Sequence, residues 1–266
     1  MTAARADELI RLDGVTKRFN GNPAVENLSF AVRRGEIVAL VGRTGAGKST
    51  ALHMMMGVMP PDAGSVAVDG MDPYRRFRDL RGRLAVSFQT DRLLPWRTAC
   101  GNVELGLQIL GVPAPERRRR AVQWLENVKI FGEENTAKYP HQLSGGMRQR
   151  VSLARALAVD PELVLLDESF SQLDHVTSAA LRADFSALVR RLGKTCVLIT
   201  HRIDDALEMA DRVMVLAAPA RLMLEVAVND ERRADAAWRE RQHEKVAAAM
   251  AEGMNSTGAI SAAAGI

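Results

Sequence analysis

The strongest constraint on the fold is a glycine-rich segment, Gly42-Arg43-Thr44-Gly45-Ala46-Gly47-Lys48-Ser49-Thr50. An apolar, β-branched run at residues 36–41 precedes it, and good helix formers follow at residues 50–57. The segment matches the G-x-x-x-x-G-K-[ST] pattern, whose backbone N–H groups converge on phosphate oxygens at a helix N-terminus. Lys48 would reach the β- and γ-phosphates, and the Ser49 hydroxyl would coordinate Mg²⁺. Strand, loop and helix together predict a phosphate-binding site in an α/β fold.

Length and composition limit the class of protein. The chain has 266 residues, 47% of them hydrophobic, which is enough for one large α/β domain or two small ones. No apolar run approaches the roughly 18 residues of a membrane-spanning helix, and residues 1–8 lack the apolar centre of a secretory signal. Cys100 and Cys196 lie far apart without metal-ligand spacing, so we expect reduced core cysteines in a cytosolic chain.

The net charge of +4 is small for a chain with this many charged residues. Much of the surplus could sit in Arg117-Arg118-Arg119-Arg120, which could bind nucleic acid or an anionic membrane or form a solvated helix face. No aromatic side chain interrupts these arginines to stack on bases. We therefore favour the solvated helix face and expect no nucleic-acid partner.

Apolar spacing divides the rest of the chain into strand-rich and helix-rich parts. The spacing is helical between residue 98 and about residue 160, and this region predicts a helical insert in an α/β core. Residues 229–250 are charged and alanine-rich, which favours a surface helix, whereas the small-residue segment 253–266 is expected to be disordered. Strand-like runs occur at residues 9–16, 28–32, 65–68, 84–88, 163–166, 196–199 and 213–216.

Two acidic residues, Asp167 and Glu168, directly follow the apolar run 163–166. In proteins with this kind of phosphate loop, such a strand ends in an aspartate that holds Mg²⁺. Glu168 would point elsewhere and could direct an attacking water as a general base. The pair could also be an ordinary polar strand end, but the loop at residues 42–50 favours the catalytic interpretation.

The segment Leu143-Ser144-Gly145-Gly146-Met147-Arg148-Gln149-Arg150 predicts a second specialised helix start. Ser144 can cap the helix, and the two glycines leave backbone N–H groups accessible to an anion. A capped helix without a ligand is the alternative for Ser-Gly-Gly alone. The whole string is far more specific, because it lies about a hundred residues after the phosphate loop and shortly before Asp167.

In this order, the motifs resemble those of the nucleotide-binding subunit of ATP-binding cassette (ABC) transporters, over about residues 8–226. The resemblance identifies residues 42–50 as the P-loop and 143–150 as the signature motif. Its remaining matches are Phe19 as the aromatic that stacks on adenine, Gln89 as the Q-loop glutamine, Asp167 as the Mg²⁺ aspartate, Glu168 as the catalytic glutamate, residues 171–174 with Asp174 as the D-loop, and His201 as the switch histidine.

The resemblance implies ATP and Mg²⁺ as ligands and a set of residues that contact them. ATP would contact Phe19, the P-loop residues 42–50, Ser144, Gly145, Gly146 and Asp174. Mg²⁺ would be held by Ser49, Gln89 and Asp167. Glu168, His201, Lys48 and Gln89 would serve hydrolysis of the γ-phosphate.

The resemblance also implies an α/β fold: a P-loop NTPase (RecA-like) core with an antiparallel β subdomain and an inserted α-helical subdomain. The core and β subdomain would occupy residues 8–89 and 160–226, and the helical subdomain with the signature motif residues 90–159. A C-terminal helical extension would follow at 227–252, with the tail at 253–266.

The assembly implied by the resemblance is a head-to-tail homodimer with two ATP molecules at its interface. Each ATP would lie between the P-loop of one copy and Ser144-Gly145-Gly146 of the other. The loop Asp91-Arg92-Leu93-Leu94-Pro95-Trp96, with Asn102 soon after, resembles importers of the nitrate, sulfonate and taurine group. Its leucines and tryptophan would face a groove that receives a short helix of the membrane subunit.

The expected function is therefore an ATPase that powers import of a small solute, an oxyanion of that group. Its partners would be a separate permease and a periplasmic or lipid-anchored solute-binding protein, and its place the cytoplasmic face of the inner membrane. One alternative is an ABC-type ATPase acting on nucleic acid or ribosomes. Another is a P-loop kinase or GTPase, in which the signature string would be a mere helix cap.

Three residues depart from the family pattern. Ser169 stands where a proline usually follows the Asp-Glu pair, and Gln172 replaces the usual alanine of the D-loop. Arg202 replaces the usual acid after the switch histidine and so reverses a charge close to the expected γ-phosphate. No residue expected to act in catalysis is lost.

Overall fold

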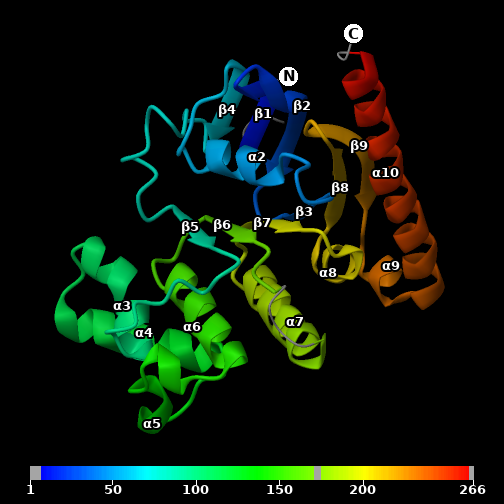
Figure 1. Cartoon of the computed structure of the whole chain (residues 1–266). Coiled ribbons are helices and arrows are strands. Elements are labelled where there is room, and N and C mark those ends of the chain that lie inside the picture. Colours follow the sequence, from blue (N-terminus) through cyan, green and yellow to red (C-terminus); the bar gives the residue numbers. More distant parts are fainter. Residues whose placement is uncertain (1–6, 171–174, 264–266) are drawn as a thin grey trace. The chain divides into compact units, whose positions relative to one another are not determined.

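The computed structural model describes residues 7–170 and 175–263 (Figure 1), and it describes the stretches 175–177 and 253–263 by their backbone alone. The chain forms two compact units. Unit 1 contains residues 1–80 and 197–266, and unit 2 contains residues 81–196. The boundary falls within strand β7 (Thr195–Thr200).

Unit 1 contains an antiparallel sheet in the order β2-β1-β4. Strands β1 (Glu8–Phe19) and β2 (Asn22–Arg33) form a hairpin, and β4 (Ala63–Val68) pairs with the other edge of β1. Asn20 and Gly21 connect the hairpin with φ values of 51° and 83°, the left-handed conformation that two-residue hairpin turns need. The strands are longer than the sequence predicted, because Lys17 continues the pairing and its Nζ donates to Asp62 at 2.6 Å.

The second sheet of unit 1 has the strand order β7-β3-β8-β9. Every residue of β3 (Ile37–Val41) is buried, and β3 runs parallel to β8 (Arg212–Ala217). Strand β9 (Arg221–Ala227) pairs antiparallel with β8. The sequence did not reveal β9, because its exposed edge position leaves no clear alternation of apolar residues. Helix α2 (Lys48–Met55) follows β3, and α8 (Ile203–Met209) follows β7.

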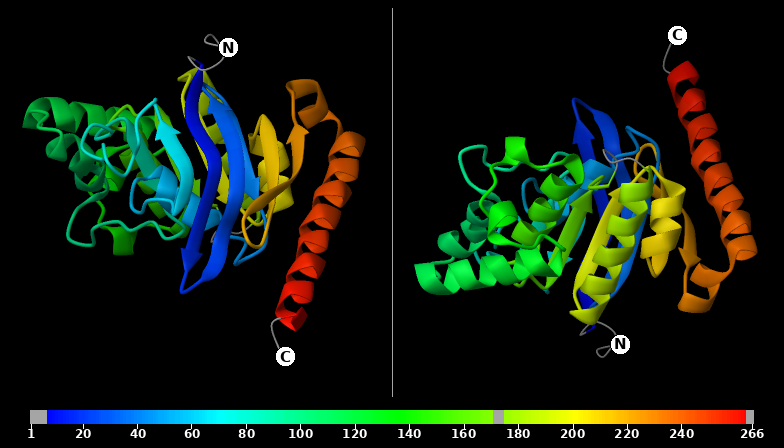
Figure 2. Two further views of the ribbon diagram at one scale, coloured as in Figure 1. Left: turned by 90° about the horizontal axis from the view of Figure 1, so that it is seen from above. Right: turned by 90° about the horizontal axis from the view of Figure 1, so that it is seen from below.

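The chain after β9 is helical. Helix α9 (Asp230–Ala234) leads into α10 (Ala236–Ala263), which packs against β8, β9 and α8 in the same unit (Figures 1 and 2). Val246 is fully buried and anchors α10. Residues 229–250, where we expected one surface helix, contain α9 and the first part of α10, and α10 extends through residues 253–263, where composition favoured disorder.

Unit 2 contains two parallel strands, β5 (Leu84–Ser87) and β6 (Leu163–Asp167). The chain between them forms α3 (Ala99–Ile109), α4 (Ala114–Asn127), α5 (Glu133–Thr136), a 3₁₀ turn η1 (Pro140–Gln142) and α6 (Gly145–Leu157). Helices α3, α4 and α6 pack on one another, which matches the expected helical insert. Helix α7 (His175–Arg191) follows β6. In the part of the chain that the structure describes, no helix is both long and apolar enough to cross a bilayer.

Candidate functional site

The P-loop connects the end of β3 to the start of α2, and two of its glycines are sterically required. A Cβ atom on Gly42 would lie 2.6 Å from the Leu216 carbonyl oxygen. Gly47 has φ of +76°, and a Cβ atom there would lie 2.1 Å from the Ala24 carbonyl oxygen. The loop therefore packs its backbone tightly against β8 and β2 and brings bare N–H groups to the N-terminus of α2.

The Lys48 side chain folds back over this loop. It is only 5% exposed, and its Nζ donates to the carbonyl oxygens of Gly42 at 2.6 Å and Arg43 at 2.9 Å. The ammonium group is thus held beside the loop amides rather than extended into solvent. Thr44, Gly45 and Ser49 are exposed. The loop can therefore accept a phosphate group from solvent while the lysine charge lies within its curve.

His201 and Phe19 also belong to unit 1. His201 directly follows β7 and is exposed, and Phe19 ends β1 with 46% of its surface exposed. Both side chains are accessible to a ligand. The Lys17 Nζ lies 5.9 Å from the Phe19 ring centroid, so a positive charge lies close to this aromatic face.

The structure reduces the electrostatic effect of Arg202. Its Nε lies 3.4 Å from Oδ1 of Asp205, which is 2% exposed, and its backbone N–H donates to the Thr200 hydroxyl at 3.0 Å. A carboxylate three residues later on α8 therefore pairs with the unusual arginine. The sequence showed the charge reversal but not this pairing, although the i, i+3 spacing of the two residues permits it.

In unit 2, the pair Asp167-Glu168 lies at the end of β6. Glu168 has φ of 47°, a conformation that is uncommon for a residue with a side chain. The chain thus turns sharply between the two carboxylates. The next residue, Ser169, is buried, and its hydroxyl donates to the carbonyl of Ser87 at 2.9 Å. Gln89 lies two residues after Ser87, beyond the end of β5.

The signature motif begins α6 as predicted. Ser144 is the N-cap, and its hydroxyl accepts a hydrogen bond from the Met147 N–H at 3.2 Å. Ser144 and Gly145 are exposed, and Gly146 is half-buried. The positive end of a 13-residue helix is therefore open to solvent, as an anion site requires.

Two arginines of α6 hold the loop at residues 90–96. Arg148 Nε donates to Asp91 Oδ2 at 3.1 Å, and Arg155 donates to the carbonyl oxygens of Arg92 and Asp91, each at 2.7 Å. Burial lowers the pKa of Arg155, and the negative charge of Asp91 partly offsets this lowering. The arginines are seven residues apart, so they share one face of the helix. The sequence contained this spacing, but nothing in it identified their partner.

Asn102 holds the same loop from α3. It is fully buried, and its Oδ1 accepts from the Leu94 N–H at 2.7 Å. Its Nδ2 lies 3.0–3.2 Å from the carbonyl oxygens of Leu94, Arg97 and Thr98. Trp96, between these anchors, is 71% exposed. The fold thus presents a large aromatic side chain outward on a firmly held loop.

The predicted site residues are divided between the units. Unit 1 holds Phe19, the P-loop and His201, whereas unit 2 holds Gln89, Asp167, Glu168 and Ser144 to Gly146. Asp174 and Gln172 lie outside the described residues. Among the residues described, no group of three or more His, Cys, Asp or Glu side chains forms a metal cluster. Coordination of Mg²⁺ by Ser49, Gln89 and Asp167 stays a prediction. These residues would offer one hydroxyl, one amide and one carboxylate oxygen, and Mg²⁺ prefers oxygen ligands.

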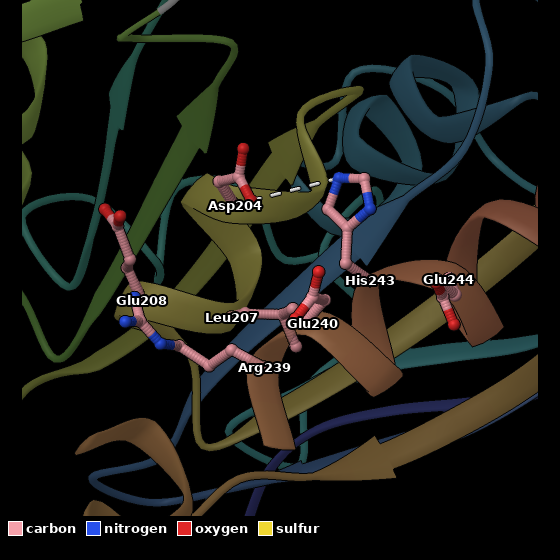
Figure 3. A pocket seen from close by; sticks show the side chains of 7 residues that line it. All are labelled: Asp204, Leu207, Glu208, Arg239, Glu240, His243 and Glu244. Atoms are coloured by element: carbon pink, nitrogen blue, oxygen red, sulfur yellow. Dashed lines mark ion pairs between the residues drawn. The ribbon is translucent and has the colours of Figure 1, made fainter. Parts of the chain in front are cut away.

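A separate pocket lies between α8 and α10 (Figure 3). His243 Nε2 and Asp204 Oδ1 face each other across it at 3.9 Å. Four of its lining residues are acidic, which disfavours a phosphate ligand, and none is a predicted site residue. The lining residues are Asp204, Leu207, Glu208, Arg239, Glu240, His243 and Glu244.

Comparison with known proteins supports the family that the motifs indicated. The family model described as ABC transporter matches residues 25–171. The chain is 41% identical over 219 residues to the methionine import ATP-binding protein MetN of Rhizobium etli, covering 81% of this chain and 60% of that protein. It is 38% identical over 222 residues to the taurine import ATP-binding protein TauB of Yersinia pestis, covering 83% of this chain and 85% of that protein. The match thus spans about three-fifths of the methionine relatives' length.

Solved structures show the same fold. A dimeric, post-hydrolysis state of the ATP-binding cassette MJ0796, bound to ADP and Pi, aligns with a TM-score of 0.72 and 31% identity. That alignment covers 83% of this chain and 99% of that one. The protein cbiO1 from Clostridium perfringens, part of the ABC transporter complex cbiONQ, aligns with a TM-score of 0.76 and 26% identity, covering 83% of this chain and 89% of that one. The predicted α/β P-loop NTPase fold is confirmed, while the domain boundaries stay a prediction.

Proposed function

We propose that this chain, which belongs to the ABC transporter family, binds and hydrolyses ATP to power import of a small solute through a separate permease. The observation that carries the proposal is the P-loop. Gly42 and Gly47 admit no side chain, and Lys48 is held within the curve of the loop at the start of α2. This geometry suits the phosphates of a nucleotide, which the backbone N–H groups and the lysine of such a loop can hold.

In the proposed reaction, the P-loop amides and Lys48 hold the β- and γ-phosphates, and Phe19 stacks on the adenine ring. Glu168 orients a water molecule and accepts its proton as the water oxygen bonds to the γ-phosphorus and the bond to the β–γ bridging oxygen breaks. His201 donates a hydrogen bond to the γ-phosphate. Ser49, Gln89 and Asp167 would hold Mg²⁺, which would supply positive charge to balance the charge on the phosphate oxygens.

We further propose that hydrolysis needs two copies of the chain. The open N-terminus of α6 at Ser144 is a second anion site, and a second copy would place it opposite the P-loop of the first. The dimeric cassettes among the similar solved structures support this arrangement. ATP would then join the two copies, and its hydrolysis would release them.

The proposed partners are the permease and a periplasmic or lipid-anchored solute-binding protein, with this subunit at the cytoplasmic face of the inner membrane. For the solute we propose a sulfonate or related oxyanion. The 91–96 loop and the 85% coverage of the taurine relative favour it. Methionine is the second candidate, because methionine import proteins match at 41% identity. Uptake of labelled taurine and methionine by vesicles containing the assembled transporter distinguishes the two.

The basic activity is tested with the purified full chain and Mg-ATP. Lys48→Ala should lower kcat/KM for ATP by roughly 100-fold or more, since it removes the charge that holds the phosphates. Lys245→Ala is the matched control, because Lys245 is exposed on α10, and its rate should stay within about twofold of wild type. Absence of ATP hydrolysis by the wild-type chain, or equal rates for Lys48→Ala and wild type, would contradict the proposal.

A further inference from the structure

Ser169 makes a buried contact for which the family resemblance offers no reason. Its side chain is 2% exposed, and its hydroxyl donates to the carbonyl oxygen of Ser87 at 2.9 Å. Both residues belong to unit 2, although 82 positions separate them in the chain. The bond joins the residue after Glu168 to the strand that leads to Gln89.

The bond lies just past the end of the β5–β6 pairing. The last paired residues are Ser87 and Leu166, and β6 ends at Asp167. The Ser169 hydroxyl therefore continues the connection between the two strands after the backbone ladder has ended. Without the Ser169 hydroxyl, the buried carbonyl oxygen of Ser87 would lose a hydrogen-bond donor.

The buried side-chain hydroxyls of Ser87 and Ser152 lie close to each other near this bond. The side-chain oxygen of Ser87 is 3.5 Å from that of Ser152 on α6, the helix that begins with the signature motif. Ser87 is fully buried, and Ser152 is 1% exposed. At 3.5 Å this contact is at the limit of a hydrogen bond, so the Ser169–Ser87 bond is the stronger link.

Glu168 needs such a constraint. A non-glycine residue with a φ of 47° persists only where its surroundings fix it. The proline that the resemblance expects at position 169 would fix its own φ but could donate no hydrogen bond. Serine lacks the proline ring that fixes φ. The hydrogen bond from its hydroxyl to the Ser87 carbonyl instead constrains the position of the segment that carries Glu168.

We propose that Ser169 is a positioning residue, whose hydroxyl ties the segment carrying Glu168 to the end of β5 and so aligns Glu168 and Gln89. This inference rests on the proposed ATPase function. Because Ser169 would act through Glu168 on the chemical step, its loss should lower kcat and leave ATP binding nearly unchanged.

The test compares Ser169→Ala, Ser169→Thr and wild type in Mg-ATP hydrolysis by the full chain. Ser169→Ala should lower kcat about tenfold while KM for ATP stays within about twofold. Ser169→Thr keeps the hydroxyl and should restore at least about half of wild-type kcat. The matched control is Thr136→Val, which removes a buried hydroxyl bond of 3.3 Å to the Glu133 carbonyl in α5. Its kcat should stay within about twofold of wild type.

All assays are run well below the lowest melting temperature of the set, so that folded proteins are compared. If Ser169→Ala does not fold, Ser169→Cys replaces it, since a thiol keeps the size but is a weak donor. The inference would be overturned, and the proposed ATPase function left intact, by either of two results. One is a kcat within twofold of wild type for Ser169→Ala, or for Ser169→Cys where it replaces Ser169→Ala. The other is an equal loss of kcat in Ser169→Ala and Ser169→Thr. A wild-type chain without ATPase activity would instead overturn the proposed function.

Discussion

Replacing Asn102 with alanine tests how the fold holds the loop at residues 90–96. Asn102 is fully buried, with one acceptor contact and three donor contacts. An amide NH₂ group has two hydrogens, so these contacts amount to about three full hydrogen bonds. At about 1 kcal/mol net for each bond, the loop should lose about 3 kcal/mol of local stability. That is roughly a 100-fold increase in the population of the open loop.

The assay is amide hydrogen exchange of Leu94, whose N–H donates directly to Asn102 Oδ1 at 2.7 Å. Its protection should fall roughly 100-fold in Asn102→Ala, while the interior of α6 keeps its protection. The control is Gln108→Ala, which removes an exposed contact to Arg97 at 3.0 Å and should change Leu94 protection less than threefold. Unchanged protection of Leu94 would refute the assignment of Asn102 as the anchor. An equal loss throughout α6 would show global rather than local opening.

Two more predictions concern the P-loop and a buried cysteine. Gly47→Ala should abolish binding of a fluorescent ATP analogue, because the added Cβ atom would lie 2.1 Å from the Ala24 carbonyl oxygen. A Kd of this variant within threefold of the wild-type Kd would contradict the prediction and show that the loop can adjust. Burial raises the pKa of the Cys100 thiol to about 11, so below that pH the unreactive thiol form prevails. In a Cys196→Ala variant, maleimide should therefore label Cys100 at pH 8 much more slowly in the native chain than in the unfolded chain. Equal labelling rates in the two states would contradict the burial of Cys100.

Much of the fold could be predicted from sequence because its signals are local. Strand β3, the glycine loop and α2 are contiguous, and the capping position of Ser144 depends on residues within one helical turn. The helical insert between β5 and β6 followed from apolar spacing in the same way. The resemblance also named the family, which the comparisons then confirmed.

The contacts that hold the site in place were less predictable. The bond of Ser169 to Ser87 and the bonds of Arg155 to the 91–92 backbone join segments more than 60 residues apart. No local pattern reports such pairs. The serine at position 169 was visible as a departure from the family, but only the structure supplies its partner.

Two elements were not evident from the local sequence pattern. Strand β9 is an exposed edge strand, so its side chains alternate too weakly to identify it. Helix α10 continues to Ala263 through small residues whose composition alone favoured disorder. For β9, the neighbouring β8 supplies a pairing partner that sequence spacing does not record.

The most direct test of the central claim, that two copies of the chain share ATP, uses the variant Glu168→Gln. The amide cannot accept a proton from water but keeps the shape of the side chain, so ATP should bind and remain intact. Light scattering after size exclusion measures the mass of this variant with Mg-ATP and with Mg-ADP. We predict twice the mass of one chain with Mg-ATP and a lower mass with Mg-ADP. The same mass with both nucleotides, at concentrations where ATP is bound, would contradict the claim.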